Sequence, residues 1–98
     1  MARFVVIATI NVVDGRMEDF LPLLLAHRDR CLADEPDTLH FQILRPKKPE
    51  NQLLVYEEYT DEQAWQTHLQ AASFTRVVAE TAGMVDVSPE GMQCTVIP

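Results

Sequence analysis

The segment 51–74 constrains the fold most, because it places a strand, a tight turn and a helix directly after one another. Residues 52–59 alternate between two faces, as the side chains of a β-strand do. Thr60 or Asp61 can then cap a helix whose acidic first turn suits the helix dipole. Across the angle between this strand and this helix, three side chains can face one another: Tyr59, Trp65 and His68.

The rest of the chain predicts further strands over residues 4–13, 38–45 and 92–97. Apolar residues at three- and four-residue steps indicate a long helix from residue 16 to about residue 34. A second helical passage follows over residues 74 to about 82, with Ser73 as its cap and Gly83 at its end. The turn-rich passage 84–91 leads into the last strand.

This order, β-α-β-β-α-β with the second helix in two pieces, predicts an α+β, ferredoxin-like fold with helices on one face of the sheet. The strand 4–13 is apolar almost throughout, which is typical of a strand covered on both faces. We expect one domain over residues 1–98. The sheet face away from the helices is apolar and needs a cover, which a second copy would provide: Val5, Ile7, Leu54 and Tyr56.

The net charge of −7 argues against nucleic acid as a partner. No apolar run approaches the roughly 20 residues of a membrane span, and the N-terminus lacks a signal-peptide pattern, so we expect a cytoplasmic protein without a membrane partner. Cys31 and Cys94 are far apart and form no CxxC pair, which favours free thiols.

Several passages together resemble the antibiotic biosynthesis monooxygenase family of small dimeric α+β barrels. They are Asp14-Gly15 after the first strand, Glu35-Pro36 before LHFQILR at residues 39–45, VYEEY at residues 55–59, and DEQAWQTHL at residues 61–69 with Phe74 beyond. The resemblance spans nearly the whole chain. It implies an apolar cavity between sheet and helices that needs neither a metal nor a flavin.

The resemblance also implies roles for single residues. Tyr59 and Trp65 match the aromatic side chains that line the cavity in quinone-forming members, whereas Val55 replaces an Asn that would hold the substrate carbonyl. A Trp in place of a Tyr can only donate a hydrogen bond. Haem-degrading members are a poorer match, because three of their haem-pocket positions hold other residues here: Ala8, His68 and Val78.

His68 is the candidate general base, oriented by Glu57, because a His in a dry pocket beside a carboxylate can titrate near neutral pH. The plainer alternative is that both side chains form a packing contact. The expected substrate-binding residues are Tyr59, Trp65, Val55, Phe74 and His27. The histidines lack metal-ligand spacings such as HxH or HExxH, so we expect no metal and no cofactor.

The leading hypothesis is a cofactor-independent monooxygenase whose partners are O2 and a small aromatic or enolisable compound. An alternative uses the same base to isomerise a small carbonyl or a phosphorylated sugar signal, with Arg45 or a helix N-terminus as the anion partner. A third treats the chain as a non-catalytic, ligand-binding dimer.

Overall fold

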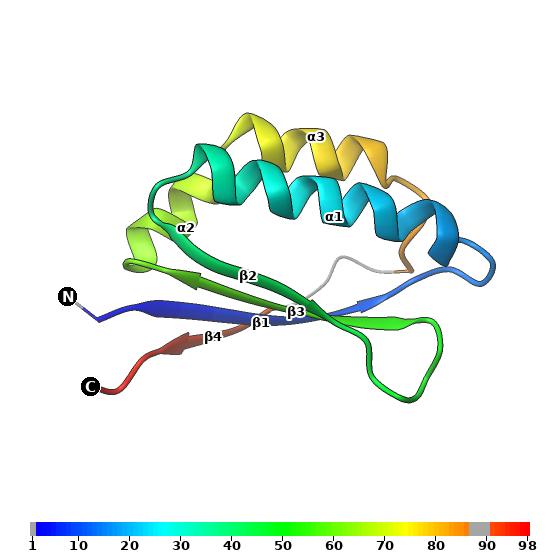
Figure 1. Ribbon diagram of the computed structural model, residues 1–98, viewed down its shortest axis with the longest axis horizontal. Helices are drawn as coiled ribbons and strands as arrows, with labels where there is room; N and C mark the ends of the chain where they lie inside the picture. The colour runs from blue at the N-terminus through cyan, green and yellow to red at the C-terminus, as the bar shows by residue number, and fades with distance from the viewer. Residues whose placement is uncertain (1, 87–90) are drawn as a thin grey trace.

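A computed structural model describes residues 2–86 and 91–98 and shows one four-stranded antiparallel sheet with helices on one face (Figure 1). The elements are β1 (Phe4–Asn11), α1 (Met17–Asp34), β2 (Thr38–Leu44), β3 (Gln52–Tyr59), α2 (Glu62–Leu69), α3 (Ala72–Glu80) and β4 (Gly91–Thr95). The strand order β2-β3-β1-β4 is that of a ferredoxin-like sheet. The predicted fold class and the division of the second helix are therefore confirmed.

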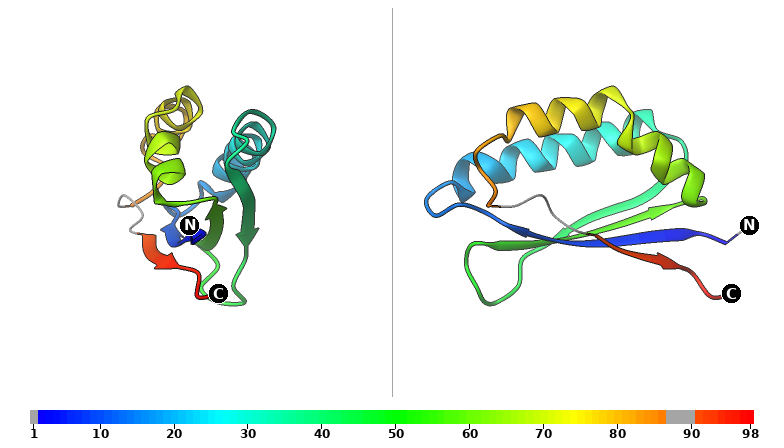
Figure 2. Two further views of the ribbon diagram at one scale, coloured as in Figure 1. Left: turned by 90° about the vertical axis from the view of Figure 1, so that its left-hand side faces the viewer. Right: turned by 180° about the vertical axis from the view of Figure 1, so that it is seen from behind.

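The core lies between the sheet and the helix layer (Figure 2). Phe20, Leu24 and Cys31 of α1 pack against Phe41 of β2 and Leu53 of β3, which all face the same side of the sheet. A smaller cluster of Phe4, Val6 and Tyr59 lies towards α2, where Ala64 and Trp65 pack against it. Burial of these apolar side chains stabilises the packing of the helices on the sheet.

Some element ends differ from the prediction. β1 ends at Asn11 rather than residue 13, because Val12 leaves the ladder for an isolated bridge to Val85. β4 runs over Gly91–Thr95 rather than residues 92–97, and Ile97 is exposed. Of the predicted turn passage, residues 87–90 lie outside the described residues.

The predicted cap of the last helix is wrong. α3 begins at Ala72 with Ala71 as its N-cap, so Ser73 lies within the first turn. Its hydroxyl donates instead to a carboxylate oxygen of Glu35, 2.9 Å away. Gly83 follows the helix with φ of 80°, a left-handed conformation that favours glycine. The predicted end of the helix at Gly83 is thus confirmed. The predicted cap Ser73 bonds to Glu35 instead of to its own helix.

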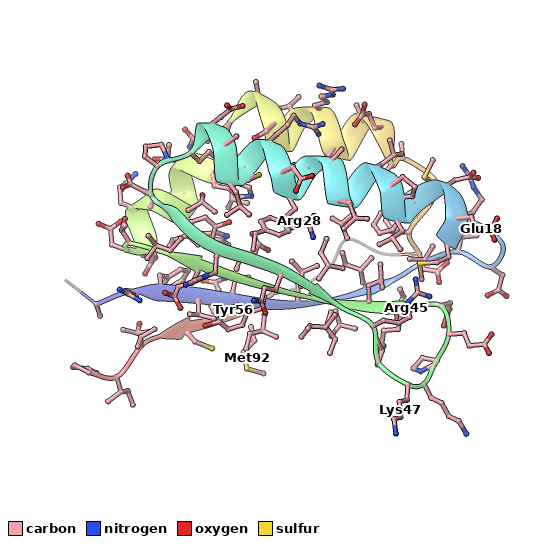
Figure 3. All side chains as sticks on the ribbon, in the orientation of Figure 1. Glu18, Arg28, Arg45, Lys47, Tyr56 and Met92 are labelled. Carbon is pink, nitrogen blue, oxygen red and sulfur yellow. The ribbon has the colours of Figure 1, made fainter. Side chains whose placement is uncertain are left out.

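The sheet face away from the helices has an uncovered apolar area. Ile7, Leu44 and Met92 are 40%, 47% and 67% exposed, whereas Val5 on the same face is buried. Tyr56 and Met92 point away from the helix layer (Figure 3). The expectation that the first strand is covered on both faces is therefore wrong for the single chain, because all three helices lie on the other side. No helix among the described residues is long and apolar enough to cross a membrane.

Candidate functional site

A cavity of about 280 Å³ lies between the helices and the sheet. Its wall is mostly apolar and includes the predicted residues Val55, Trp65 and Phe74. Its polar lining comes from four side chains: His27, Glu57, His68 and Thr81. Among the described residues that line it there is no Lys or Arg. The cavity is therefore an apolar chamber with a local group of imidazoles and a carboxylate.

His68 is placed by α2, whose start is fixed by Asp61. The Asp61 carboxylate accepts a hydrogen bond from the backbone N–H of Ala64 at 2.8 Å, as an N-cap does. His68 lies near the end of this helix, is only 3% exposed and lines the cavity. The predicted cap thus orients the segment that carries the candidate base.

Glu35, rather than Glu57, makes the close contact with His68. The His68 Nδ1 atom lies 2.8 Å from Glu35 Oε1, whereas its Nε2 atom lies 3.7 Å from Glu57 Oε1. An Nδ1–H that donates to Glu35 leaves the Nε2 lone pair on the side of Glu57 and the cavity. The predicted partner Glu57 thus lies beside His68, and Glu35 is a second and nearer carboxylate.

The Glu35 carboxylate is held by residues from several elements. Thr38 Oγ1 donates to its Oε1 atom and Ser73 Oγ to its Oε2 atom, each at 2.9 Å, and its backbone N–H donates to the Cys31 carbonyl. Burial by itself raises the pKa of Glu35, but the hydrogen bonds from His68 and Ser73 outweigh it and the pKa is lowered. Glu35 therefore remains an anion beside His68.

Sequence reasoning missed Glu35 as a site residue, because Glu35 directly follows the predicted long helix and a proline beside it is typical of a helix end. The local signal for that end was sound, since α1 stops at Asp34. The contact with His68 spans 33 residues, and no spacing in the chain points to it. Only the tertiary fold, which brings the end of α1 against α2, shows it.

Glu57 lies deeper against the sheet and has a different environment. Burial raises the pKa of Glu57, although the hydroxyl of Tyr59, which donates to Glu57 Oε1 at 2.5 Å, works in the other direction. Burial and the neighbouring Glu57 also raise the pKa of Tyr59. Tyr59 is fully buried and is not among the cavity-lining residues, so it contacts Glu57 rather than the cavity.

The other predicted side chains gather around His68. Ring centroids lie 5.6 Å apart between His68 and Phe74 and 5.7 Å apart between His68 and His27. Trp65 packs on Phe4 at 5.4 Å while it lines the cavity. The cavity thus brings together six of the seven predicted residues, namely His68, Glu57, Trp65, Val55, Phe74 and His27.

A cluster that sequence reasoning did not find lies next to the cavity. His27 and Cys31 of α1 meet His68 of α2, and one potential ligand atom from each lies within 4.8 Å of the other two. Burial lowers the pKa of His27 to about 4, with the charges of His68 and Arg30 adding to the effect. Burial also raises the pKa of Cys31 to about 12. The signal in the sequence was the four-residue step from His27 to Cys31, which puts both on one helix face.

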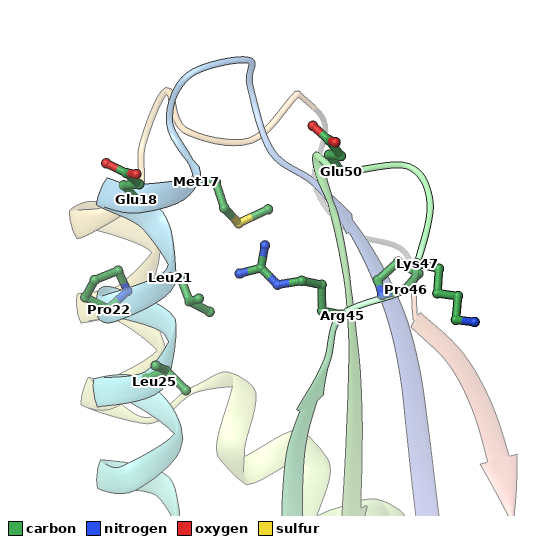
Figure 4. A pocket seen from close by; sticks show the side chains of 9 residues that line it. All are labelled: Met17, Glu18, Leu21, Pro22, Leu25, Arg45, Pro46, Lys47 and Glu50. Atoms are coloured by element: carbon green, nitrogen blue, oxygen red, sulfur yellow. The ribbon is translucent and has the colours of Figure 1, made fainter.

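A larger hollow of about 740 Å³ lies at the other end of α1, beside the β2–β3 connection (Figure 4). It holds both basic and acidic side chains, among them Arg45, Lys47, Glu18 and Glu50. The expected anion partner Arg45 therefore lies outside the cavity of His68. We assign the site to the smaller cavity, because the buried titratable groups with shifted pKa values gather there.

The sequence model that describes the antibiotic biosynthesis monooxygenase family matches residues 3–80 of the chain. Among solved structures, a Caulobacter crescentus protein named provisionally as such a monooxygenase is 23% identical, with a TM-score of 0.93 over 99% of this chain and 92% of its own. A Nitrosomonas europaea protein with the same provisional name is 18% identical, with a TM-score of 0.91 over 98% and 91%.

A conserved protein from Methanosarcina mazei is 18% identical, with a TM-score of 0.86 over 96% of this chain and 92% of its own. No protein of curated function matches the chain. Likeness at these identities concerns the fold, whereas the family model matches most of the sequence. The chain therefore belongs to the antibiotic biosynthesis monooxygenase family.

Proposed function

We propose that the protein is a cofactor-independent monooxygenase for a small aromatic or enolisable compound. The observation that carries this proposal is the contact of 2.8 Å between His68 Nδ1 and Glu35 Oε1 at the wall of an apolar cavity. An ionised Glu35 that accepts a hydrogen bond from the His68 Nδ1–H keeps the Nε2 lone pair available, and a nearby Glu57 adds negative potential. His68 is then a general base that faces a substrate.

The reaction follows from removal of a proton from an activated methylene group. His68 takes the first proton, and the carbanion adds to O2 to form a hydroperoxide after reprotonation. Loss of the second proton from the same carbon, together with loss of hydroxide as water, leaves a carbonyl group. One methylene group and one O2 thus give one carbonyl group and one water, and the substrate supplies all the electrons. An apolar chamber favours this step because it accommodates O2 and keeps the carbanion poorly solvated.

The size and charge of the cavity support a small neutral substrate. Its volume of about 280 Å³ lies just below the range of about 300–1,000 Å³ that is usual for small-molecule sites. Glu57 lines it, Glu35 lies just behind His68, and the described lining holds no cation to offset them. A phosphorylated sugar would meet unfavourable electrostatics there, so the isomerase alternative applies best to a neutral carbonyl compound.

The test is O2 uptake with a panel of quinols and 1,3-dicarbonyl compounds, for wild type and His68→Ala. We expect turnover of at least one compound and a loss of about 10²-fold or more in the variant, the usual effect of removing a general base. His40→Ala is the matched control, because His40 is exposed on the opposite sheet face and should leave the rate unchanged.

Two outcomes would contradict the proposal. Product formation under argon at the aerobic rate would indicate isomerisation rather than oxygenation. Undiminished O2 uptake by His68→Ala would remove His68 as the base. Compounds that raise the melting temperature without any turnover would favour the non-catalytic, ligand-binding alternative.

We also propose that a second copy of the chain covers the outer sheet face. Supporting this is the exposed apolar group on that face, where Ile7, Leu44 and Met92 lie on three different strands. Several exposed apolar side chains on one sheet face without a helix cover are typical of protein interfaces.

A further inference from the structure

Three buried side chains that can bind a metal meet beside the cavity. The Cys31 Sγ atom lies 3.5 Å from His27 Nε2 and 3.9 Å from His68 Nδ1. All three residues are nearly inaccessible to solvent, with exposed fractions of 3% for His27, 0% for Cys31 and 3% for His68. Two of the side chains also line the cavity, which gives an ion a route to the cluster.

The spacing of these atoms is close to that of a tetrahedral zinc site. Zinc–nitrogen bonds of about 2.0–2.1 Å and zinc–sulfur bonds of about 2.3 Å imply nitrogen–sulfur separations of roughly 3.6 Å and nitrogen–nitrogen separations of roughly 3.3 Å. The two nitrogen–sulfur distances here lie within a few tenths of an ångström of that value. The potential ligand atoms of the two histidines lie no more than 4.8 Å apart, so rotation of the rings can close the remaining distance.

The surroundings also suit a divalent cation. A metal on His68 Nδ1 replaces the hydrogen bond of 2.8 Å from this atom to Glu35 Oε1, and the Glu35 carboxylate then balances two positive charges together with a Cys31 thiolate. Glu57, 3.7 Å from His68 Nε2, can accept a hydrogen bond from the proton that this nitrogen carries when Nδ1 binds a metal. A carboxylate behind a metal-bound imidazole is a common arrangement that fixes the ring. Thiolate with imidazole selects zinc-type ions over magnesium or calcium.

We propose that His27, Cys31 and His68 bind one zinc-type divalent cation, and that the bound ion inhibits the enzyme by occupying His68. Binding releases the thiol proton of Cys31 to solvent, and the proton on His68 moves from Nδ1 to Nε2, so that no lone pair remains for a substrate. The cation binds through existing lone pairs and no electron is transferred. The inhibitory part of this inference rests on the proposed function, whereas the binding part does not.

The binding part is tested with cobalt(II) as a spectroscopic substitute for zinc, on wild type, Cys31→Ser and His27→Gln. We expect wild type to show thiolate-to-cobalt charge transfer and the strong visible bands of tetrahedral cobalt, which zinc then abolishes by displacement. Each variant should lower the affinity at least about tenfold, since even the loss of a supporting residue costs that much. Cys94→Ser is the matched control and should keep the bands, because Cys94 lies on the outer sheet face.

The proposal is overturned if the bands are absent from folded wild type at saturating cobalt, if Cys31→Ser keeps them, or if Cys94→Ser loses them. If circular dichroism shows that Cys31→Ser does not fold, the cobalt bands of His27→Gln alone test the binding. For the inhibitory part, zinc should suppress turnover of wild type but not of Cys31→Ser relative to its own zinc-free rate. If zinc binds without slowing turnover by wild type, only the inhibitory part is overturned. If the protein shows no turnover, the inhibitory part falls with the proposed function, and the cobalt result still tests the binding part.

Discussion

Equally buried residues in this site differ in the polar partners that they contact. His27 and His68 are equally buried, but only His68 has a carboxylate within 3 Å. His27 instead lies against Phe41 and Cys31, and burial lowers its pKa to about 4. A buried neutral imidazole is stable at neutral pH but opposes folding once the unfolded chain can bind a proton that the folded chain cannot.

His27 should therefore make stability depend on pH. Its pKa in the folded chain is depressed, so its contribution is complete above the ordinary value of 6.5 and is lost as the pH falls towards 4. The shift corresponds to about 3 kcal/mol over that window, at about 1.4 kcal/mol for each pKa unit. Denaturant unfolding at pH 7.0 and 5.0 is the measurement, and His27→Gln should flatten the difference between the two.

His40→Gln is the control for this prediction, because His40 is exposed and its replacement should leave the pH dependence as in wild type. An equal slope in wild type and His27→Gln would show that other groups cause the acid sensitivity.

Whether the sequence predicts a site residue depends on how far apart along the chain that residue and its partners lie. His68, Trp65 and Phe74 were assigned to the cavity because they share one short stretch with the strand below them. Tyr59 belongs to the same stretch, yet it is fully buried and bonded to Glu57, since the alternation of a strand tells which face a residue occupies but not how deeply it is buried. Glu35 could not be predicted because its partners come from three other segments.

Among the elements, α2 combines a predictable start with an important position. Asp61 caps it through a contact only three residues long, which is why the sequence alone indicated it. The start of α3 was not predictable in the same way, because Ser73 bonds to a residue 38 positions away instead of capping its own helix. Local hydrogen bonds can be inferred from spacing, whereas those between elements depend on the tertiary fold.

Removal of the α2 cap should destabilise the protein measurably. We expect Asp61→Ala to cost about 1 kcal/mol, which lowers the melting temperature of a domain of this size by roughly 4–8 °C. Differential scanning calorimetry is the measurement. Glu62→Gln, which removes a first-turn charge without touching the cap, should lower the melting temperature by much less.

For this prediction, a melting temperature of Asp61→Ala equal to that of wild type would mean that packing of α2 on β3 holds the helix in place without the cap.

On the scale of the whole molecule, the helices cover one face of the sheet and leave the other face uncovered. On the outer face of the sheet, Ile7, Leu44 and Met92 are exposed, whereas Val5 on the same face is buried. The sequence predicted an apolar outer face at Val5, Ile7, Leu54 and Tyr56. It could not show how much of the face the chain itself covers, because the position of all three helices is a property of the complete fold.

The proposed second copy leads to a test by sedimentation. Wild type should sediment as a dimer at micromolar concentration, and Ile7→Glu should sediment as a monomer, because a carboxylate at the centre of the interface would be buried without a partner. Leu32→Glu is the matched control: Leu32 is 44% exposed, but it lies on α1 on the other side of the sheet. A monomeric wild type, or a dimeric Ile7→Glu, would contradict the proposed interface.

The contacts of Glu35 join the end of α1, the start of β2, α2 and α3 at one carboxylate. A chain whose helices have formed but have not docked contains every residue of the cavity and still lacks this junction. Such a chain cannot hold the Nδ1 proton of His68 in place, so it has no oriented base. Glu35 thereby makes the orientation of His68 depend on the completed packing of the helices, so that under the proposed function only a fully folded chain holds its base in place.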